Sequence, residues 1–276
     1  MNPTVTENMP EEEYFAIDRM SKSTLWPFSY STKNGAAMLE EPFTGNASTV
    51  LGSGFHRLVE DEGWDNIIEH TATKTSDTKA FKQQEQENPD KTVILAKDAK
   101  RLRKMWESMK AHPKVSKVIS ESSKAELVLQ WDDDILQLPM KCRIDRVFPG
   151  IGGVDVKTVA ECTVRKIENN IKDYGYHAQA ALYCRAMMVC MDIKDPAWLF
   201  SWHETGKPYD CIVSGVPVED IAQGWDELKR AAARYRKWKE TGLAPGISEV
   251  ALTLGLPQYA KVERLTAVHT IADVYK

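Results

Sequence analysis

The segment that decides the fold spans residues 140–157 and has the sequence Met-Lys-Cys-Arg-Ile-Asp-Arg-Val-Phe-Pro-Gly-Ile-Gly-Gly-Val-Asp-Val-Lys. Apolar and polar residues alternate on both sides of Pro149 and Gly150, which predicts two adjacent strands joined by a turn. Asp155 and Lys157 are two residues apart and therefore share one face of the second strand. The turn would bring Asp145 alongside Asp155 across the hairpin.

Two carboxylates beside one lysine suit the hydrolysis of phosphodiesters. At neutral pH this reaction needs a metal ion that polarises a phosphoryl oxygen and acidifies a water, and carboxylates that hold the metal. Neighbouring carboxylates repel each other unless a cation compensates them, and Mg²⁺ prefers oxygen ligands. A simpler interpretation is that Asp145 and Asp155 form ordinary ion pairs with nearby basic residues. The apolar residues that flank both aspartates disfavour it.

Other motifs lie on both sides of this hairpin. Gly52 and His56 form G-x-x-x-H on a helix predicted over 47–61, and Gln179 and Tyr183 form Q-x-x-x-Y on a helix predicted over 176–191. Judged alone, His56 on an apolar helix face is more often a core histidine than a ligand. A Q-x-x-x-Y pair is equally common in ordinary helix contacts. The order of the motifs therefore carries more weight than any one of them.

In this order the motifs resemble those of the RecB-like PD-(D/E)XK nucleases. Within that superfamily the chain is most similar to the RecE-type exonucleases, because Asp173-Tyr174-x-Tyr176-His177 directly precedes Gln179, and Glu126 opens an apolar strand. The resemblance covers roughly residues 21–260. Two positions depart from the pattern, since Ile144 replaces the nominal proline and Cys142 replaces a frequent glycine. Neither departure removes a ligand.

The resemblance implies a role for each motif residue. The metal ligands would be His56, Asp145, Asp155 and the backbone carbonyl of Val156. Lys157 would position or activate water, Gln179 and Tyr183 would orient Lys157 or the phosphate, and Glu126 would be a further acid of the catalytic set. Candidate DNA contacts are Arg143, Tyr176, His177, Lys100, Arg101 and Lys104. The last three belong to a basic run over 97–104 that, like a second run over 229–239, is more often only a solvated helix face.

The same resemblance implies an activity and partners. It implies a Mg²⁺-dependent exonuclease, with Mn²⁺ as a substitute, that digests double-stranded DNA processively from its ends. The polarity would be 5′-to-3′, and the product a 3′ single strand for recombination. A RecT-type annealing protein would be the partner, and a homo-oligomer, a tetrameric ring, would encircle the DNA. The basic runs over 97–104 and 229–239 are the candidates to line its bore.

Three alternatives remain open at this stage. A Cas4-like nuclease would carry four cysteines that ligate an iron–sulfur cluster, a pattern that the cysteine spacing does not match. A restriction-type endonuclease would cut within duplexes after reading base edges. A degenerate nuclease fold would act only as a DNA-binding module, although such modules commonly lose the metal carboxylates or the lysine.

Composition sets the remaining limits. A net charge of −4 argues against a protein that coats nucleic acid over its whole surface, but it allows a local basic groove. The five cysteines are odd in number and form no C-x-x-C pair, which indicates reduced thiols. The acidic amino terminus resembles no signal peptide, and no apolar run is long enough for a membrane span, so a cytoplasmic protein is expected.

The predicted fold is an α/β PD-(D/E)XK nuclease core with a mixed central β-sheet flanked by helices and an amino-terminal helical flank. Residues 1–13 are predicted to form a disordered acidic arm, and residues 14–276 a single nuclease domain. The polar stretch over 71–92 is expected to form an exposed helix or a mobile loop.

Overall fold

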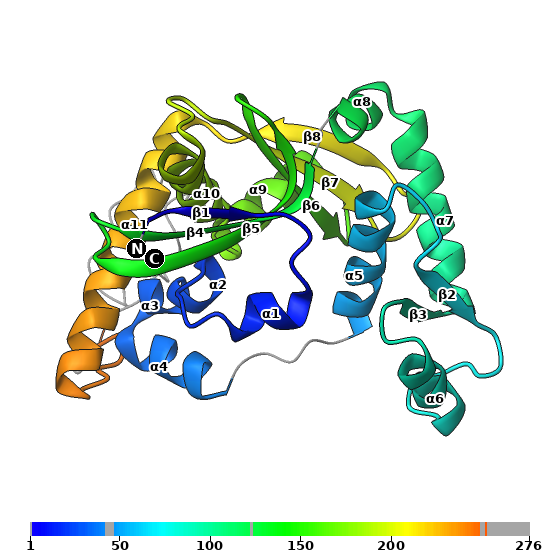
Figure 1. Ribbon diagram of the computed structural model, residues 1–276, viewed down its shortest axis with the longest axis horizontal. Coiled ribbons are helices and arrows are strands. Elements are labelled where there is room, and N and C mark those ends of the chain that lie inside the picture. The colour runs from blue at the N-terminus through cyan, green and yellow to red at the C-terminus, as the bar shows by residue number, and fades with distance from the viewer. Residues whose placement is uncertain (1, 42–46, 122–123, 249–251, 253–276) are drawn as a thin grey trace, which may run out of the picture.

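The computed structural model describes residues 2–41, 47–121, 124–248 and 252. At its centre lies a six-stranded sheet in the spatial order β1-β4-β5-β6-β7-β8 (Figure 1). Its strands are β1 (Thr4–Thr6), β4 (Lys124–Asp133), β5 (Leu138–Phe148), β6 (Gly152–Val159), β7 (Ala197–Glu204) and β8 (Cys211–Gly215). Strands β6 and β7 run parallel, and the other neighbours run antiparallel. The predicted mixed sheet is thus confirmed.

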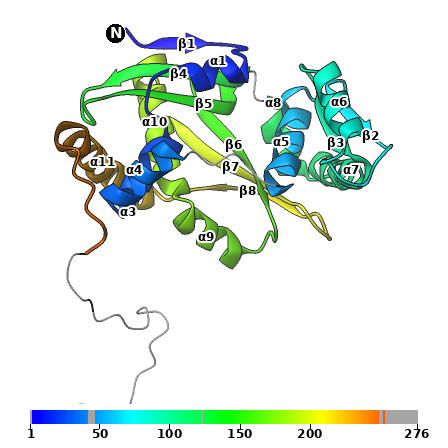
Figure 2. The ribbon, with the colours of Figure 1, turned by 90° about the horizontal axis from the view of Figure 1, so that it is seen from below.

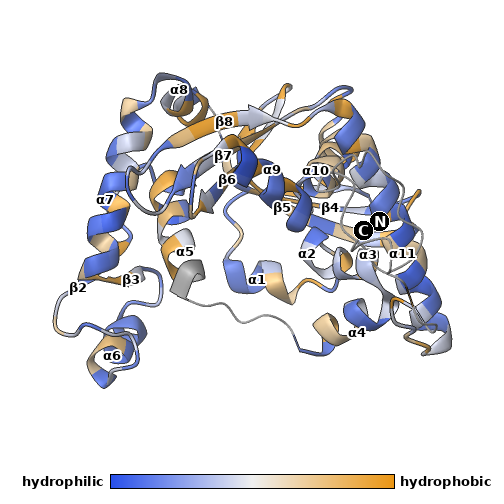
Figure 3. Ribbon diagram, turned by 180° about the vertical axis from the view of Figure 1, so that it is seen from behind, coloured by the Kyte–Doolittle hydropathy of each residue, from blue (hydrophilic) through white to orange (hydrophobic). Residues whose placement is uncertain are grey.

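Helices cover both faces of this sheet (Figure 2). One group consists of α2 (Lys22–Leu25), α3 (Pro27–Tyr30), α4 (Thr32–Glu40), α10 (Tyr176–Met191) and α11 (Val218–Thr241). The other consists of α5 (Ala47–Glu60), α7 (Ala96–Ala111) and α8 (Pro113–Glu121), and α9 (Val164–Asp173) leads into α10. Charged outer faces of α7 and α11 contrast with the more apolar strands, as expected for helices packed on a buried sheet (Figure 3).

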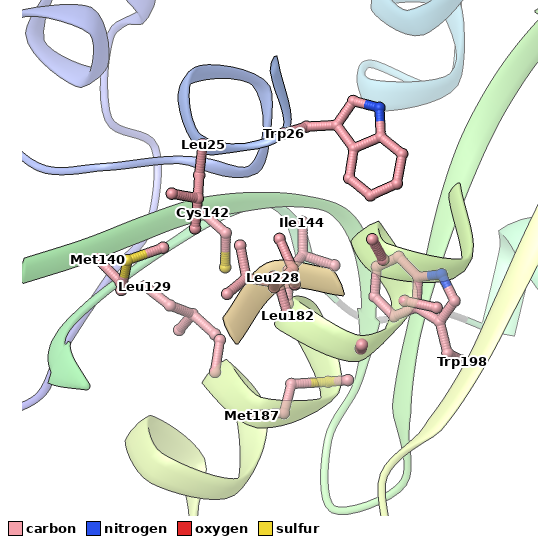
Figure 4. Close-up of a cluster of buried hydrophobic side chains, with 14 of the residues drawn as sticks. Leu25, Trp26, Leu129, Met140, Cys142, Ile144, Leu182, Met187, Trp198 and Leu228 are labelled. Carbon is pink, nitrogen blue, oxygen red and sulfur yellow. The ribbon is translucent and has the colours of Figure 1, made fainter. Parts of the chain in front are cut away.

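The larger core cluster lies between α10 and the sheet. Apolar side chains of β4 and β5 meet Leu182 and Met187 of α10. Trp26, between α2 and α3, and Leu228 of α11 reach the same cluster (Figure 4). Helix α11 approaches α10 closely at Gly224, where a Cβ atom would lie 2.7 Å from the Ala178 backbone. This contact requires glycine, and it holds α10 firmly against the strands that carry the candidate site.

A second core cluster lies between α5 and the opposite face of the sheet. Leu51, Phe55 and Leu58 form the apolar stripe predicted for this helix, and they pack with Leu102 of α7 and Val156 of β6. Strand β6 is therefore covered on both faces, as its parallel pairing with β7 favours. Val156 faces the α5 side, and its neighbours Asp155 and Lys157 face the α10 side.

The segment after α5 contains more regular structure than its composition predicted. Strands β2 (Ile67–His70) and β3 (Thr92–Leu95) form a separate parallel pair, and the helix expected between them is α6 (Lys79–Glu87). The loop alternative for this region is thus wrong over α6. The strand pair was missed because four-residue strands are too short to show a periodicity.

The amino terminus also differs from the disordered arm that its acidic composition predicted. Strand β1 pairs with β4, and α1 (Glu11–Ala16) follows it. The buried Lys141 donates hydrogen bonds to the carbonyls of Tyr14 at 2.7 Å and Ile17 at 2.9 Å. The amino-terminal segment is therefore held by its pairing with the edge of β4 and by its hydrogen bonds from the Lys141 ammonium, although its own composition favours disorder.

The expected amino-terminal helical flank is present as α1 to α4. Ser21 caps α2 through a capping box with Thr24. No helix among the described residues is both long and apolar enough to cross a membrane.

Candidate active site

The β5–β6 hairpin places the two aspartates opposite each other. Arg146 pairs with Val154 in the antiparallel register, so the next position along sets Asp145 against Asp155. The regular ladder stops there, and the Val156 amide donates a hydrogen bond of 2.7 Å to Asp145 Oδ2. In a regular strand, residues three apart point to opposite faces, yet Ile144 and Val147 both belong to the larger core cluster. The alternation of side chains is therefore broken between them, and Asp145 lies at this irregularity.

Three side chains from separate elements converge beside this break. His56 of α5, Glu126 of β4 and Asp145 each offer a ligand atom, and these atoms lie within 4.8 Å of one another. His56 Nδ1 is 3.3 Å from Asp145 Oδ2. The register around Glu126 places it opposite Asp145 on the neighbouring strand, and its φ of 49° is rare for a residue with a side chain. Backbone strain of this kind is concentrated at functional sites.

The electrostatics of this cluster favour a bound cation. Burial and the neighbouring Asp145 carboxylate raise the pKa of Glu126 to about 8, although Arg143 opposes the effect. Arg143 Nε lies 2.7 Å from Glu126 Oε2. Two carboxylates in close contact repel each other, and a divalent metal would relieve the repulsion. An imidazole and two carboxylates also match the ligands that hard divalent ions accept. The residues therefore fit the metal that the sequence implied.

Asp155 and Lys157 form a buried ion pair next to the cluster. Asp155 is only 3% exposed, its Oδ2 contacts the Lys157 ammonium, and its Oδ1 accepts a hydrogen bond from Gln179 Nε2. Burial raises the pKa of Asp155 to about 6, Lys157 opposes this, and Asp145 adds to it. Burial alone would lower the pKa of Lys157, but Asp155, Tyr176 and Asp145 together raise it above its ordinary value. Lys157 is thus a fixed positive charge in this arrangement.

Two residues of the predicted site lie in other positions relative to the cluster than expected. Glu126 was expected outside the ligands, yet it belongs to the His56–Asp145 cluster because the hairpin register places it there. Asp155 was expected as a direct ligand, and it lies beside the cluster with its oxygens directed to Lys157 and Gln179. The Val156 amide donates a hydrogen bond to Asp145, so the backbone of β6 lies beside the cluster at this residue.

The α10 residues also take positions that differ in part from those expected. Gln179 donates its hydrogen bond to Asp155, the carboxylate that pairs with Lys157. The Tyr183 ring packs edge-to-face on Trp198 with centroids 5.0 Å apart, which is a core contact. The Tyr176 ring lies 4.6 Å from the Lys157 ammonium. His177 is buried and contacts Glu227 at 2.9 Å and the Ile171 carbonyl at 3.2 Å. This histidine is therefore held within the α9–α10–α11 packing.

Among the remaining candidate DNA contacts, most cations are already paired within the chain. Arg101 donates hydrogen bonds to the Thr205 carbonyl at 2.9 and 3.1 Å, and Lys104 pairs with Glu107 at 2.7 Å, whereas Lys100 is exposed. On α11, Arg234 donates to the Phe28 and Ser29 carbonyls. At least part of each basic run therefore stabilises the fold.

Tyr14 lies beside the candidate site although its sequence gave no reason to select it. Tyr14 of α1 lies with its ring centroid 5.1 Å from the Arg143 guanidinium, and Arg143 in turn pairs with Glu126. A lone tyrosine in an acidic arm carries no motif, so only the packing of α1 reveals it.

Comparison with known proteins agrees with this geometry. A family model described as a PDDEXK-like domain of unknown function (DUF3799) matches residues 21–254. The chain belongs to this family. A provisionally named exonuclease from Eubacterium rectale, of known crystal structure, has a similar fold, with a TM-score of 0.64 and 16% sequence identity over 98% of each chain. No curated protein sequence matches the chain at a significant level. Together the family and the fold identify a PD-(D/E)XK nuclease-like protein.

Proposed function

We propose that this protein is a divalent-metal-dependent exonuclease of RecE type, which hydrolyses double-stranded DNA from its ends. The observation that carries the proposal is the cluster of His56, Glu126 and Asp145 directly beside the buried Asp155–Lys157 pair. The E. rectale protein of similar fold, which bears the name exonuclease, supports the same choice. The proposal includes Mg²⁺ as the metal, 5′-to-3′ polarity and a 3′ single-stranded product.

The residues of the site divide the work of hydrolysis among them. His56, Glu126 and Asp145 would hold the metal with Asp155 and the Val156 carbonyl close by, and the metal would polarise the phosphoryl oxygen and acidify a water. Lys157 keeps its proton, so it contributes positive charge toward the developing negative charge on the phosphate. Gln179 fixes the Asp155 carboxylate that holds Lys157 in place.

The Cas4-like alternative does not fit the described residues. All five cysteines are free, and the group of metal-ligating side chains found in the described part of the chain contains no cysteine. An iron–sulfur cluster needs four thiolates in one place. The restriction-type and non-catalytic alternatives are decided by experiment.

The deciding experiment is a time course on end-labelled linear duplex with Mg²⁺, run beside a closed circular duplex of the same sequence. An exonuclease releases label from the linear DNA and leaves the circle intact. Cleavage of the circle would favour a restriction-type endonuclease, and no cleavage of either would favour a binding module. Asp155→Asn serves as the inactive control, and Mn²⁺ in place of Mg²⁺ tests the choice of metal. Labels placed separately at the 5′ and 3′ ends give the polarity.

The proposed assembly is a tetrameric ring that encircles the DNA, with a RecT-type annealing protein as its partner. A closed ring made by head-to-tail contacts leaves no interface unpaired. Light scattering measures the mass, and a monomeric mass would exclude the ring without affecting the nuclease assignment. Co-purification with a candidate annealing protein tests the partner separately.

A further inference from the structure

A second lysine lies beside the candidate active site, outside every motif that identified it. Lys22 is the first residue of α2, and its ammonium donates a hydrogen bond to the Tyr174 carbonyl. Its ammonium lies 5.2 Å from the Trp26 ring centroid and 5.8 Å from that of Tyr176. Tyr176 is the same ring that Lys157 approaches to 4.6 Å. Two ammonium groups from distant parts of the chain thus share one aromatic ring.

The charge of Lys22 is poorly compensated within the described part of the chain. Two other cations of this region have a carboxylate partner: Lys157 pairs with Asp155, and Arg143 pairs with Glu126. Lys141 has none, but two carbonyls at the end of α1 accept its hydrogen bonds. Among the described residues, Lys22 has one carbonyl and no carboxylate within salt-bridge distance. A desolvated ammonium in this situation lacks the anion that would stabilise it.

The ionisation of Lys22 reflects the same deficit. Burial lowers its pKa to about 7, the charge of Lys157 lowers it further, and the attraction of Asp155 opposes both. Additional negative charge beside Lys22 would therefore stabilise its ammonium form. A phosphate of a nucleic acid is an anion that would supply this charge.

We propose that Lys22 is a DNA-binding residue, whose ammonium contacts a backbone phosphate next to the one that lies at the metal cluster. This inference rests on the proposed nuclease function. The Trp26 and Tyr176 rings both lie beside the Lys22 ammonium, so it is positioned before DNA arrives. Lys157 acts on the reacting phosphate. Lys22 binds the adjacent phosphate and thereby sets which phosphate of the DNA strand lies at the metal cluster.

The test compares Lys22→Met with Lys22→Arg and with Lys166→Met, which removes an exposed lysine of α9. Each variant is made in the Asp155→Asn background, and binding of a labelled duplex is measured with Ca²⁺ between 50 and 200 mM salt. Loss of one phosphate contact should reduce the magnitude of the slope of log K against log salt by about 0.9. It should also weaken binding roughly tenfold. Arginine should restore both, and Lys166→Met should change neither. Wild-type affinity and slope in Lys22→Met, or an equal loss in Lys166→Met, would overturn the proposal.

Two further measurements separate binding from folding and from the nuclease assignment. Lys22→Met should melt no lower than wild type, because it removes an uncompensated charge and keeps the apolar stem. If it does melt lower, acetylation of the wild-type protein decides the matter. DNA should then protect Lys22 but not Lys166 from the reagent, and equal labelling with and without DNA would refute the contact. If the wild type cleaves DNA while Lys22 is unimportant, this inference alone fails. If the wild type neither binds nor cleaves DNA, the proposed function fails as well.

Discussion

Glu126 gives the sharpest prediction about stability, because its carboxyl group is buried against Asp145. Burial and Asp145 raise the pKa of Glu126 from 4.5 to about 8 in the metal-free protein. A carboxyl group whose pKa is higher in the folded state binds its proton more tightly there than in the unfolded chain. The free energy of unfolding therefore falls as the pH rises from about 4.5 to about 8. The raised pKa of Asp155 acts in the same direction up to about pH 6.

The size of the effect follows from the change in pKa. Each pKa unit corresponds to about 1.4 kcal/mol, so the linkage for Glu126 has an upper limit of about 5 kcal/mol. Arg143 stays beside the carboxylate and the site can admit water, so we expect a loss of about 2 kcal/mol between pH 5 and pH 8. For a chain of this size that corresponds to a fall in Tm of roughly 4–8 °C. Glu126→Gln removes the titration and should flatten the profile over this range.

The assay is thermal unfolding in chelator from pH 5 to pH 8, repeated with Ca²⁺, which binds without supporting turnover in many Mg²⁺ sites. A metal present at a hundred times its Kd should restore about 2.7 kcal/mol to the wild type at pH 8, and less to Glu126→Gln. Glu219→Gln, an exposed substitution on α11, controls for the loss of a surface charge. A wild-type Tm independent of pH in chelator, or a Glu126→Gln profile as steep as that of wild type, would refute the reasoning.

Three other outcomes are expected from the same geometry. Asp155→Asn and Lys157→Met should each lower DNA hydrolysis by roughly a thousandfold, because each removes a charge at the reacting phosphate. Both keep the side-chain volume, so the circular dichroism spectrum should not change. Wild-type turnover in either variant would exclude the site. Gln179→Leu should lower kcat about 10- to 100-fold, because the Asp155 carboxylate loses the hydrogen bond that orients it. KM should change little, since the proposed role of Gln179 involves no contact with the substrate. A change confined to KM would argue against this positioning role. Asp133→Ala should lower the free energy of unfolding, measured in urea, by about 3 kcal/mol or more. The reason is that this buried carboxylate accepts hydrogen bonds from Trp131 and Arg185, both at 2.9 Å. A loss no greater than that caused by Asp134→Ala, at an exposed position, would contradict the prediction.

Local patterns were enough to predict the elements that build the site. Alternation on both sides of Pro149 and Gly150 predicted β5 and β6, and three- and four-residue spacing predicted the apolar face of α5. These signals are local because side-chain direction in a strand or helix repeats over a few residues. The predicted positions of Asp155 and Lys157 on one face of β6 depend on nothing beyond that repeat. The short strands β2 and β3 escaped the same reasoning because their length is close to a single repeat.

The sequence by itself determined the order of the motifs, the hairpin that opposes Asp145 to Asp155, and the helices that carry His56 and Gln179. Tertiary structure decided how these groups are combined. The inclusion of Glu126 depends on the β4–β5 register and on a backbone conformation that its neighbours impose. The partner of Gln179 depends on how closely α10 packs on β6, and the place of Lys22 depends on α2, which is more than 130 residues away from Lys157. Contacts between such distant segments leave no periodic trace in the chain, since each depends on the shape of the whole core and not on the residues next in sequence.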